Sequence, residues 1–223
     1  MTDARRQTRI QRKNTKTILE AALDVFSQNG FRGATLDQIA HAAGLSKPNL
    51  LYYFRSKDAI HKELLSGLME QWLAPLHRLD AEGDPIEEII DYMLRKLEMA
   101  QELPRESRLF ANEIVQGAPR IISQIEGELR SLVDEKSAVI QTWVDQGKIA
   151  PYAPHHLIFS IWATTQHYAD FDAQVRGILQ PQDDTYFTDA ASFLRDFYRR
   201  ALTPVNQTDR NWARVNAPET KHG

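Results

Sequence analysis

The chain has 223 residues, enough for one large domain or for a small and a medium-sized one, and its formal net charge is −3. It contains no cysteine, which excludes disulfides, thiolate zinc sites and cysteine nucleophiles. No apolar run approaches the roughly twenty residues needed to cross a bilayer, and the arginine-rich N-terminus lacks the apolar core of a secretory signal, so we expect a soluble cytoplasmic protein.

The N-terminal part of the chain is basic. Residues 1–60 hold ten Lys or Arg and five Asp or Glu, whereas residues 61–223 hold seventeen and twenty-five. Such a split predicts a basic head that faces nucleic acid and an acidic body. The basic arm 1–12 is expected to be a disordered tail in the free protein and to follow phosphates, or enter a minor groove, on DNA. The first predicted helix covers about 13–29 and stops at Gly30.

The next two predicted helices are short and joined by a glycine turn. Thr35 is a good N-cap because its hydroxyl accepts a hydrogen bond from a free first-turn amide, and Gln38 completes a capping box. Gly44 suits the left-handed position after the first short helix, and Ser46 caps the second. Parts in this order predict a helix-turn-helix unit that reads the DNA major groove.

In such a unit the first residues of the second helix reach base edges. The residues expected to contact bases are Ser46, Lys47, Asn49 and Tyr52. Lys47 can reach guanine acceptors, and Asn49 can pair with adenine. Phosphate contacts, which set register without reading sequence, are expected from Thr35, Tyr53 and Lys57. The alternative is a plain pair of core helices, but the capped turn and the YYF–x–SK ending favour DNA binding.

Six further helices are predicted, with proline at several starts and glycine at several ends. They cover about 57–74, 85–101, 104–116, 119–146, 155–176 and 184–202. The helix 155–176 is apolar on nearly every side, as a helix buried on two faces is. We expect one face to pack on its own domain and the other, with the last helix, to pair two copies into a homodimer.

These elements divide the chain into an arm, a DNA-binding domain, a body and a tail. The predicted bounds are 1–12 for the arm, 13–60 for the DNA-binding domain (motif about 34–53), 61–202 for the effector-binding and dimerisation domain, and 203–223 for a loose polar tail. The prediction is therefore an all-α protein of nine helices.

The segments FSQNGFRGATL, DQIAHAAGLSKPNLLYYF and SKDAI resemble the tetracycline-repressor (TetR) family of bacterial regulators. This resemblance implies the TetR-like fold, in which an N-terminal helix-turn-helix domain precedes a helical domain for ligand binding and dimerisation. It also implies a ligand-responsive repressor or activator that binds palindromic double-stranded operator DNA as a homodimer in the bacterial cytoplasm. No cofactor is implied.

Within that family, WLAPL (72–76), ESRLF (106–110) and PHHLIFSIWATTQHYADF (154–171) resemble the regulators of pyrimidine utilisation. The resemblance implies release from DNA on binding uracil or thymine, and control of genes for nucleobase catabolism. A regulator of the same fold that senses another small planar ligand is the alternative.

The chemistry and this resemblance together indicate five candidate effector contacts. A planar nucleobase needs an apolar slot with a few placed polar groups. Trp72 offers a stacking face, and Gln166 carries both a donor and an acceptor for an amide edge. Arg108 can bind a carbonyl oxygen, Ser107 can add a contact, and Trp162 lies one turn before Gln166 on the same face.

Each candidate also has a purely structural alternative. Trp72 and Trp162 can be ordinary core residues, and Gln166 can hydrogen-bond across the dimer. Arg108 can instead pair with an acidic side chain, for which the candidates are Glu113 and Asp170. Buried polar groups most often serve structure in this way.

Other functions have weaker support. The potential metal ligands His155, His156, His167 and Asp170 lack a recognised spacing, so no metal site is predicted. No nucleophile elbow, phosphate loop or catalytic carboxylate pair is present, so we expect no enzyme activity. An enzyme on a helical scaffold and a nucleoid protein that binds DNA only through its arm remain as alternatives from other classes.

Overall fold

The computed structural model describes residues 2–204, with side chains from residue 9 onward, and within that range it is helical and has no strand. Its elements are α1 (Thr2–Gly33), α2 (Leu36–Ala42), α3 (Lys47–Tyr53), α4 (Lys57–His77), α5 (Pro85–Glu102), α6 (Pro104–Val115), α7 (Ile122–Gln124), the π-helical turn η1 (Ile125–Leu129), α8 (Arg130–Asp145), α9 (Pro154–Asp170), α10 (Asp172–Leu179) and α11 (Tyr186–Leu202). The all-α prediction is confirmed. Most of the predicted tail, residues 205–223, lies outside the described residues.

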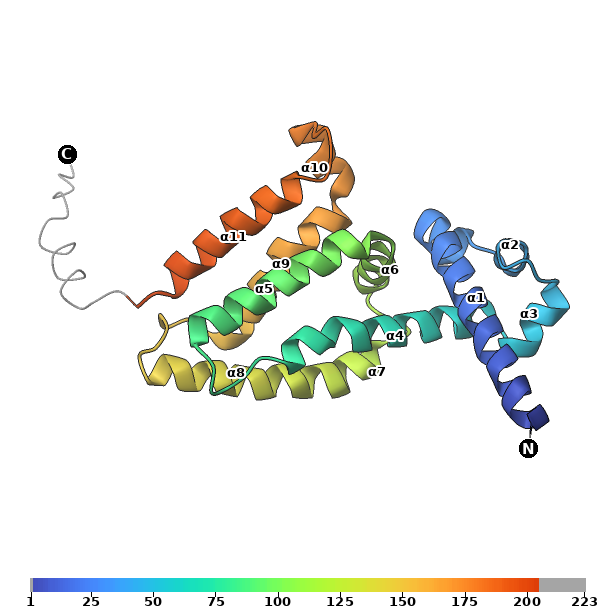
Figure 1. Ribbon diagram of the computed structural model, residues 1–223, viewed down its shortest axis with the longest axis horizontal. Helices are drawn as coiled ribbons and strands as arrows, with labels where there is room; N and C mark the ends of the chain where they lie inside the picture. Colours follow the sequence, from blue (N-terminus) through green and yellow to red (C-terminus); the bar gives the residue numbers. More distant parts are fainter. Residues whose placement is uncertain (1, 205–223) are drawn as a thin grey trace, which may run out of the picture.

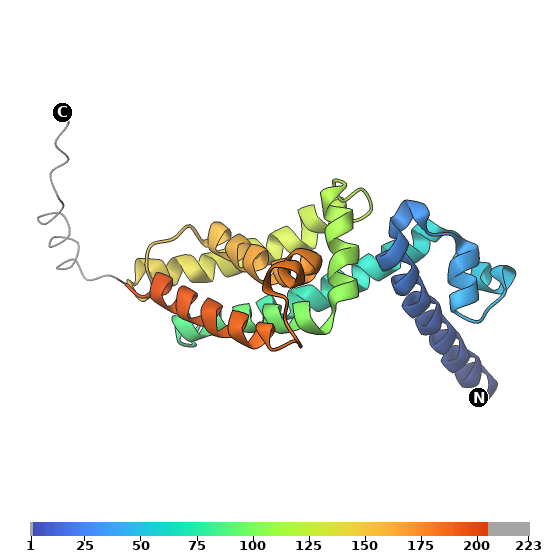
Figure 2. The ribbon, with the colours of Figure 1, turned by 90° about the horizontal axis from the view of Figure 1, so that it is seen from above.

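The molecule has a head of α1–α3 at one end and a body of α5–α11 at the other, joined by α4 (Figures 1 and 2). The helix α4 starts beneath the head and runs into the body, where α5 and α8 lie along it. One hydrophobic core continues through both parts, from Ile18 in α1 to Leu202 in α11. The head is therefore packed directly onto the helix that enters the body.

The predicted turn chemistry of the head is confirmed. The hydroxyl of Thr35 accepts a hydrogen bond from the backbone amide of Gln38, while the side chain of Gln38 accepts one from the amide of Thr35 at 2.8 Å. Ser46 caps α3 by accepting from the amide of Asn49. Gly44 has φ +66°, a left-handed conformation in which a Cβ would be strained. These local interactions fix the angle at which α3 leaves α2.

The first helix is longer than predicted. It begins at Thr2 instead of about residue 13, so the expected disordered arm is corrected to a helical backbone over residues 2–12. No glycine or proline lies between residue 2 and residue 29, so nothing in the sequence interrupts propagation of the helix. At Gly30 (φ +65°, ψ 175°) the helix kinks as predicted, but a last turn continues to Gly33.

The body also departs from the prediction. The helix expected over 155–176 is two helices that meet at Phe171, so with α7, η1 and α8 taken as one continuous helix the described residues form ten helices and not nine. Arg176 binds both Asp172, at 2.8 Å, and Asp184, at 2.7 Å, and this pairing holds α10 against the turn before α11. The helix expected from Pro119 begins only at Ile122.

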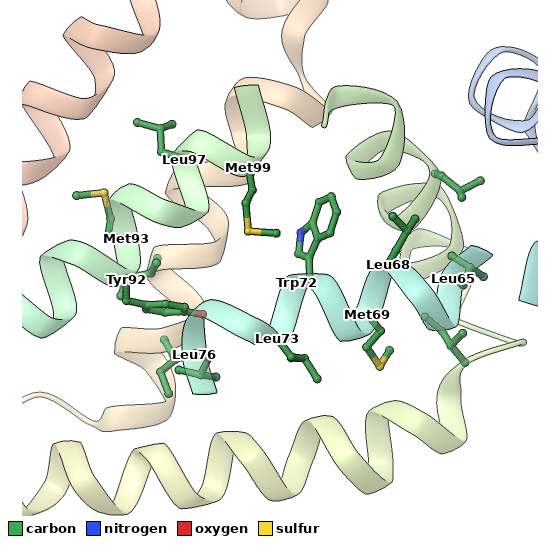
Figure 3. Packing of buried hydrophobic residues seen from close by; sticks show 14 of the residues in the cluster. Leu65, Leu68, Met69, Trp72, Leu73, Leu76, Tyr92, Met93, Leu97 and Met99 are labelled. Carbon is green, nitrogen blue, oxygen red and sulfur yellow. The ribbon is translucent and has the colours of Figure 1, made fainter. Parts of the chain in front are cut away.

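The residues of α4 position the candidate effector site. Its buried side chains are Ile60, His61, Leu65, Leu68, Met69, Trp72, Leu73, Pro75 and Leu76. Figure 3 shows Trp72 rising from α4 towards α5 and α6, whereas Met69 and Leu73 point the opposite way, towards α8. Among the described helices, none combines the length and apolar character needed to cross a membrane.

Candidate DNA-reading helix and effector cavity

The helix α3 presents most of its predicted base-reading residues to solvent. Leu50 is its single buried side chain and anchors it to the core of the head. Ser46, Lys47 and Asn49 are exposed, and Tyr52 is 70% exposed, an unusual position for a large aromatic side chain. This exposed start of a short helix has the geometry that a major-groove reader requires.

Several of the predicted DNA contacts already have partners within the head. Lys47 pairs with Asp37 at 2.9 Å, but both side chains are largely exposed. Such a surface pair is worth only about 0.2–1 kcal/mol, so a DNA acceptor can replace it. The hydroxyl of Tyr53 accepts a hydrogen bond from the side-chain amide of Asn14 at 2.7 Å, and the hydroxyl of Thr35 serves the N-cap of α2.

Lys57 also has partners within the head. Its ammonium donates to the backbone carbonyls of Phe31 at 2.7 Å and Ala34 at 2.6 Å, and it lies 4.5 Å from the centre of the Phe31 ring. The kink of α1 at Gly30 brings these carbonyls to the first turn of α4. Lys57 therefore ties α1 to the first turn of α4, and its phosphate contact stays a prediction.

A second cluster joins the head to the body. Arg120, in the loop before α7, binds Asp58 of α4 and Glu113 of α6, each at 2.8 Å. Its guanidinium lies 3.6 Å from the centre of the Phe31 ring of α1. Glu113 is buried, so its pairing with Arg120 satisfies a charge that burial would otherwise penalise. One side chain thus connects α1, α4 and α6.

His61 of α4 lies beneath this cluster. Its ring makes edge contacts with Phe26 and Phe31. Its Nδ1 is 3.9 Å from a Glu113 oxygen and has no hydrogen-bond partner among the described residues. Burial, followed by the charge of Arg120, lowers the pKa of His61 to about 4. The imidazole is therefore neutral near pH 7.

The body contains a small cavity of about 50 Å³ between α4, α5, α6, η1 and α9. Its lining residues are Met69, Trp72, Leu73, Tyr92, Lys96, Phe110, Leu129, Trp162 and Gln166. Three of the five predicted effector contacts, namely Trp72, Trp162 and Gln166, are thus brought together. The cavity is far below the roughly 300–1,000 Å³ of typical ligand sites, so it suits only a small molecule.

The aromatic walls of the cavity are fixed by packing. Trp72 lies nearly parallel to Phe110, with ring centres 6.5 Å apart and an angle of 15° between the planes. The indole N–H of Trp162 donates to the hydroxyl of Tyr92 at 2.6 Å. Burial raises the pKa of that hydroxyl. The side-chain amide of Gln166 has no hydrogen-bond partner among the described residues and remains free to bind a ligand.

The other two predicted contacts, Ser107 and Arg108, are not among the residues that line the cavity. Ser107 is buried, and its hydroxyl donates to a carboxylate oxygen of Asp170 at 2.5 Å. Arg108 is half-buried. Burial raises the pKa of Asp170, and the charge of Arg108 opposes that shift. It does not pair with Glu113, whose carboxylate binds Arg120. The hydroxyl of Ser107 therefore joins α6 to Asp170 of α9.

The sequence prediction missed Lys96, the one lysine that lines the cavity. It is 3% exposed and lies on the buried face of α5, with its ammonium 5.3 Å from the centre of the Trp72 ring. A signal was available, because Lys96 follows the core residues Ile89 and Met93 at helical spacing. A lysine in the apolar stripe of a helix is an exception that indicates a function or a partner.

Among the described residues, no group of three or more His, Asp or Glu side chains is arranged to hold a metal ion. His155 pairs with Asp134 at 2.9 Å on the surface, and His167 stacks on Phe171. Both histidines therefore make contacts of an ordinary structural kind.

Comparison with known proteins agrees with this geometry. Residues 18–64 match the family described as bacterial regulatory proteins of the tetR family, and residues 65–205 match the C-terminal region of YcdC-like proteins. The regulator RutR of Escherichia coli O157:H7 is 46% identical over 191 residues, which cover 85% of this chain and 90% of that protein. The chain belongs to the TetR family. It is a TetR-family transcriptional regulator with a DNA-binding helix-turn-helix domain.

Other relatives and solved structures cover a wide range of sequence identity. RutR of Escherichia coli K12 is 45% identical over the same length, whereas the regulator UidR of that strain is 25% identical over 150 residues, 65% of this chain and 73% of its own. A TetR-family protein from Rhodococcus RHA1 has a TM-score of 0.69 at 14% identity, covering 87% of this chain and 99% of its own. AibR, solved with isovaleryl coenzyme A and operator DNA, has a TM-score of 0.64 at 16% identity, with coverages of 82% and 97%. These structures support the fold alone.

Proposed function

We propose that this TetR-family protein is a ligand-responsive regulator that binds palindromic operator DNA as a homodimer and releases it when a pyrimidine nucleobase, uracil or thymine, fills the cavity. The observation that carries the proposal is the continuity of α4. Its first residue, Lys57, donates a hydrogen bond to the backbone carbonyl of Phe31 in the head, and Trp72 on the same helix lines the cavity. The two residues are about 22 Å apart along the helix axis.

The DNA-binding part of the proposal rests on the exposed face of α3. In this proposal Lys47 and Asn49 reach base edges, Tyr52 packs on the DNA, and Thr35 and Tyr53 approach phosphates. Two copies of α3 in adjacent major grooves lie one turn, about 34 Å, apart. The basic face of residues 9–16 adds charge next to that surface.

The homodimer rests on an apolar surface of α9 and α11. Phe159 of α9 is 46% exposed, and Phe193 and Phe197 of α11 are 63% and 51% exposed and stack on each other. These rings, with the nearby apolar side chains, form a patch that a monomer would leave in water. A second copy of the same two helices is the occupant that two-fold symmetry offers.

The effector part of the proposal rests on the lining of the cavity. Its walls are apolar and aromatic, and the free amide of Gln166 presents a donor and an acceptor, which suits a ring amide edge. The resemblance to regulators of pyrimidine utilisation favours uracil or thymine over other small planar molecules. A target set of nucleobase-catabolism genes follows from the same resemblance. Nothing in this arrangement supplies a nucleophile with a base, so we assign regulation and no catalysis.

The coupling follows from the position of α4. A ring seated on Trp72 favours the tilt of α4 that accommodates it, and the bonds of Lys57 and Arg120 carry that tilt to the head. The separation of the two α3 helices then changes and operator affinity falls. Only a ligand with different affinities for the two arrangements can act in this way, and typical coupling free energies are about 1–3 kcal/mol.

The test begins with a DNA site selected by the protein from a random pool and measures fluorescence anisotropy of that site at fixed salt. Uracil is expected to lower the affinity of the wild-type protein and to have little effect on Gln166→Ala. Gln174→Ala, at an exposed position of α10, serves as the matched control. Operator binding that persists at saturating uracil and thymine contradicts the proposed effector; release by another planar compound supports the alternative regulator.

A further inference from the structure

Lys96 is a lysine that lines the cavity although its side chain is almost fully buried. It is 3% exposed, and among the described residues its ammonium has neither a hydrogen bond nor an ion pair. Burying an unpaired charge is costly, and the face of Trp72, 5.3 Å away, offsets only part of that cost. A buried lysine without a protein partner is therefore suited to bind a ligand.

The carboxylate of Asp170, whose charge influences the pKa of Lys96, already has a hydrogen-bond partner. Asp170 of α9 acts on Lys96 through its charge but makes no ion pair with it, and its carboxylate accepts the hydroxyl of Ser107. Burial lowers the pKa of Lys96 to about 7 and raises that of Asp170. Arg108 of α6 and His167 of α9 act on Asp170 in turn. The ammonium thus retains donors for an additional acceptor.

We propose that Lys96 is the specificity-determining contact of the effector, donating a hydrogen bond to a ring carbonyl oxygen while the ring stacks on Trp72. This inference rests on the proposed function and extends it. Gln166, from α9, pairs with the adjacent amide edge of the same ring. Because an ammonium has three donors and no acceptor, it favours a ring carbonyl and disfavours a ring amine at the same position.

The ligand class follows from this chemistry. The cavity should take a small planar lactam or imide, such as uracil or thymine, and discriminate against cytosine, in which an amino group replaces one carbonyl. Discrimination arises because the wrong ring would leave the buried ammonium facing another donor, and a site that pairs polar groups rejects analogues that leave them unpaired.

The test compares calorimetric titrations of uracil and cytosine into the wild-type protein, Lys96→Met and Lys136→Met. Lys136 is the matched control, because it is also buried in the body but donates to the carbonyl of Leu79 away from the cavity. We expect Lys96→Met to weaken uracil binding about 10- to 100-fold, the range for a charged hydrogen bond, and to narrow the preference for uracil over cytosine. Lys136→Met should leave both the affinity for uracil and the preference for uracil over cytosine unchanged.

The outcomes separate the two proposals. A wild-type protein that binds no pyrimidine overturns the proposed effector and this inference with it. Wild-type binding of uracil that survives Lys96→Met, or that falls equally for uracil and cytosine, overturns the inference alone. Thermal melting checks that each variant is folded. A second variant, Lys96→Gln, tests the preference between uracil and cytosine, because its side-chain amide can accept as well as donate a hydrogen bond. The inference requires it to shift the preference towards cytosine.

Discussion

The ammonium of Lys57 donates a hydrogen bond to the carbonyl oxygen of Ala34 at 2.6 Å, across the corner between α1 and α2. Ala34 is buried, so its carbonyl has few other donors within reach. The bond ties the first turn of α4 to the helix-turn-helix unit. Lys57, which the sequence pattern had placed at the DNA surface, therefore helps to fix the orientation of the head on α4.

Replacing Lys57 with Met should destabilise the protein by about 1–3 kcal/mol, because two carbonyls in the head lose their donor. Urea unfolding measures the loss, with Lys62→Met, at an exposed position of α4, as the control. Operator binding should weaken without a change in its dependence on salt. A salt slope reduced by about 1 would instead mean that Lys57 contacts a phosphate, as first predicted.

The stability of the protein should fall as the pH drops from about 6.5 towards 4 because of His61. Burial and Arg120 hold the folded pKa at about 4, below the unfolded value of about 6.5, so in this window the unfolded chain binds the proton more readily. The contribution is fully present above pH 6.5 and is lost, by up to about 3 kcal/mol, as the pH falls to 4.

The measurement is urea unfolding at several pH values for the wild type and His61→Leu. The variant should lose most of this slope, whereas His77→Gln, at an exposed position near the end of α4, should keep it. An unchanged slope in His61→Leu would assign the acid sensitivity to other groups.

Replacing Phe197 with Arg should convert the protein to a monomer, because the charge would be buried against the second copy of α9 and α11. Sedimentation at micromolar concentration measures the change, and affinity for a palindromic site should fall with it. Val115→Ser removes a more exposed apolar side chain at the end of α6 and should leave the assembly intact. If Phe197→Arg remains a dimer, the interface lies on a surface other than that of α9 and α11.

Uracil binding should weaken as the pH rises above about 7, since the Lys96 ammonium then loses its proton in the unliganded protein. A ligand oxygen favours the charged form, so affinity is highest below the free pKa and declines by at most about tenfold per pH unit above it. Titrations between pH 6 and 8.5 measure this, and Lys96→Met should abolish the dependence. A profile shared by wild type and variant would point to a different titrating group.

The sequence predicted best what depends on neighbouring residues. The capping box of Thr35 and Gln38 and the left-handed Gly44 are local, so the helix-turn-helix unit could be read directly. The break at Phe171 could not, because the position of α10 after it depends on the pair that Arg176 makes with Asp184 in the following turn. Tertiary contacts can override a local helical pattern in this way.

The cavity was predicted in part for the same reason. Trp72, Trp162 and Gln166 could be chosen by residue type, but the bond between Ser107 and Asp170 joins α6 to α9 across 63 positions of the chain. Lys96 was missed because charged residues on a helix usually face water, and only the packed structure shows that this one does not.

The π-helical turn η1 has a consequence for how such proteins can diverge. Its backbone hydrogen bonds span five residues instead of the four of an α-helix, and it lies between α7 and α8 with Leu129 at the cavity wall. Deleting a single residue within 125–129 would restore α-helical pitch while leaving the register of α8 almost unchanged. Homologues should therefore tolerate one-residue gaps there, and such gaps would move Leu129 at the cavity wall.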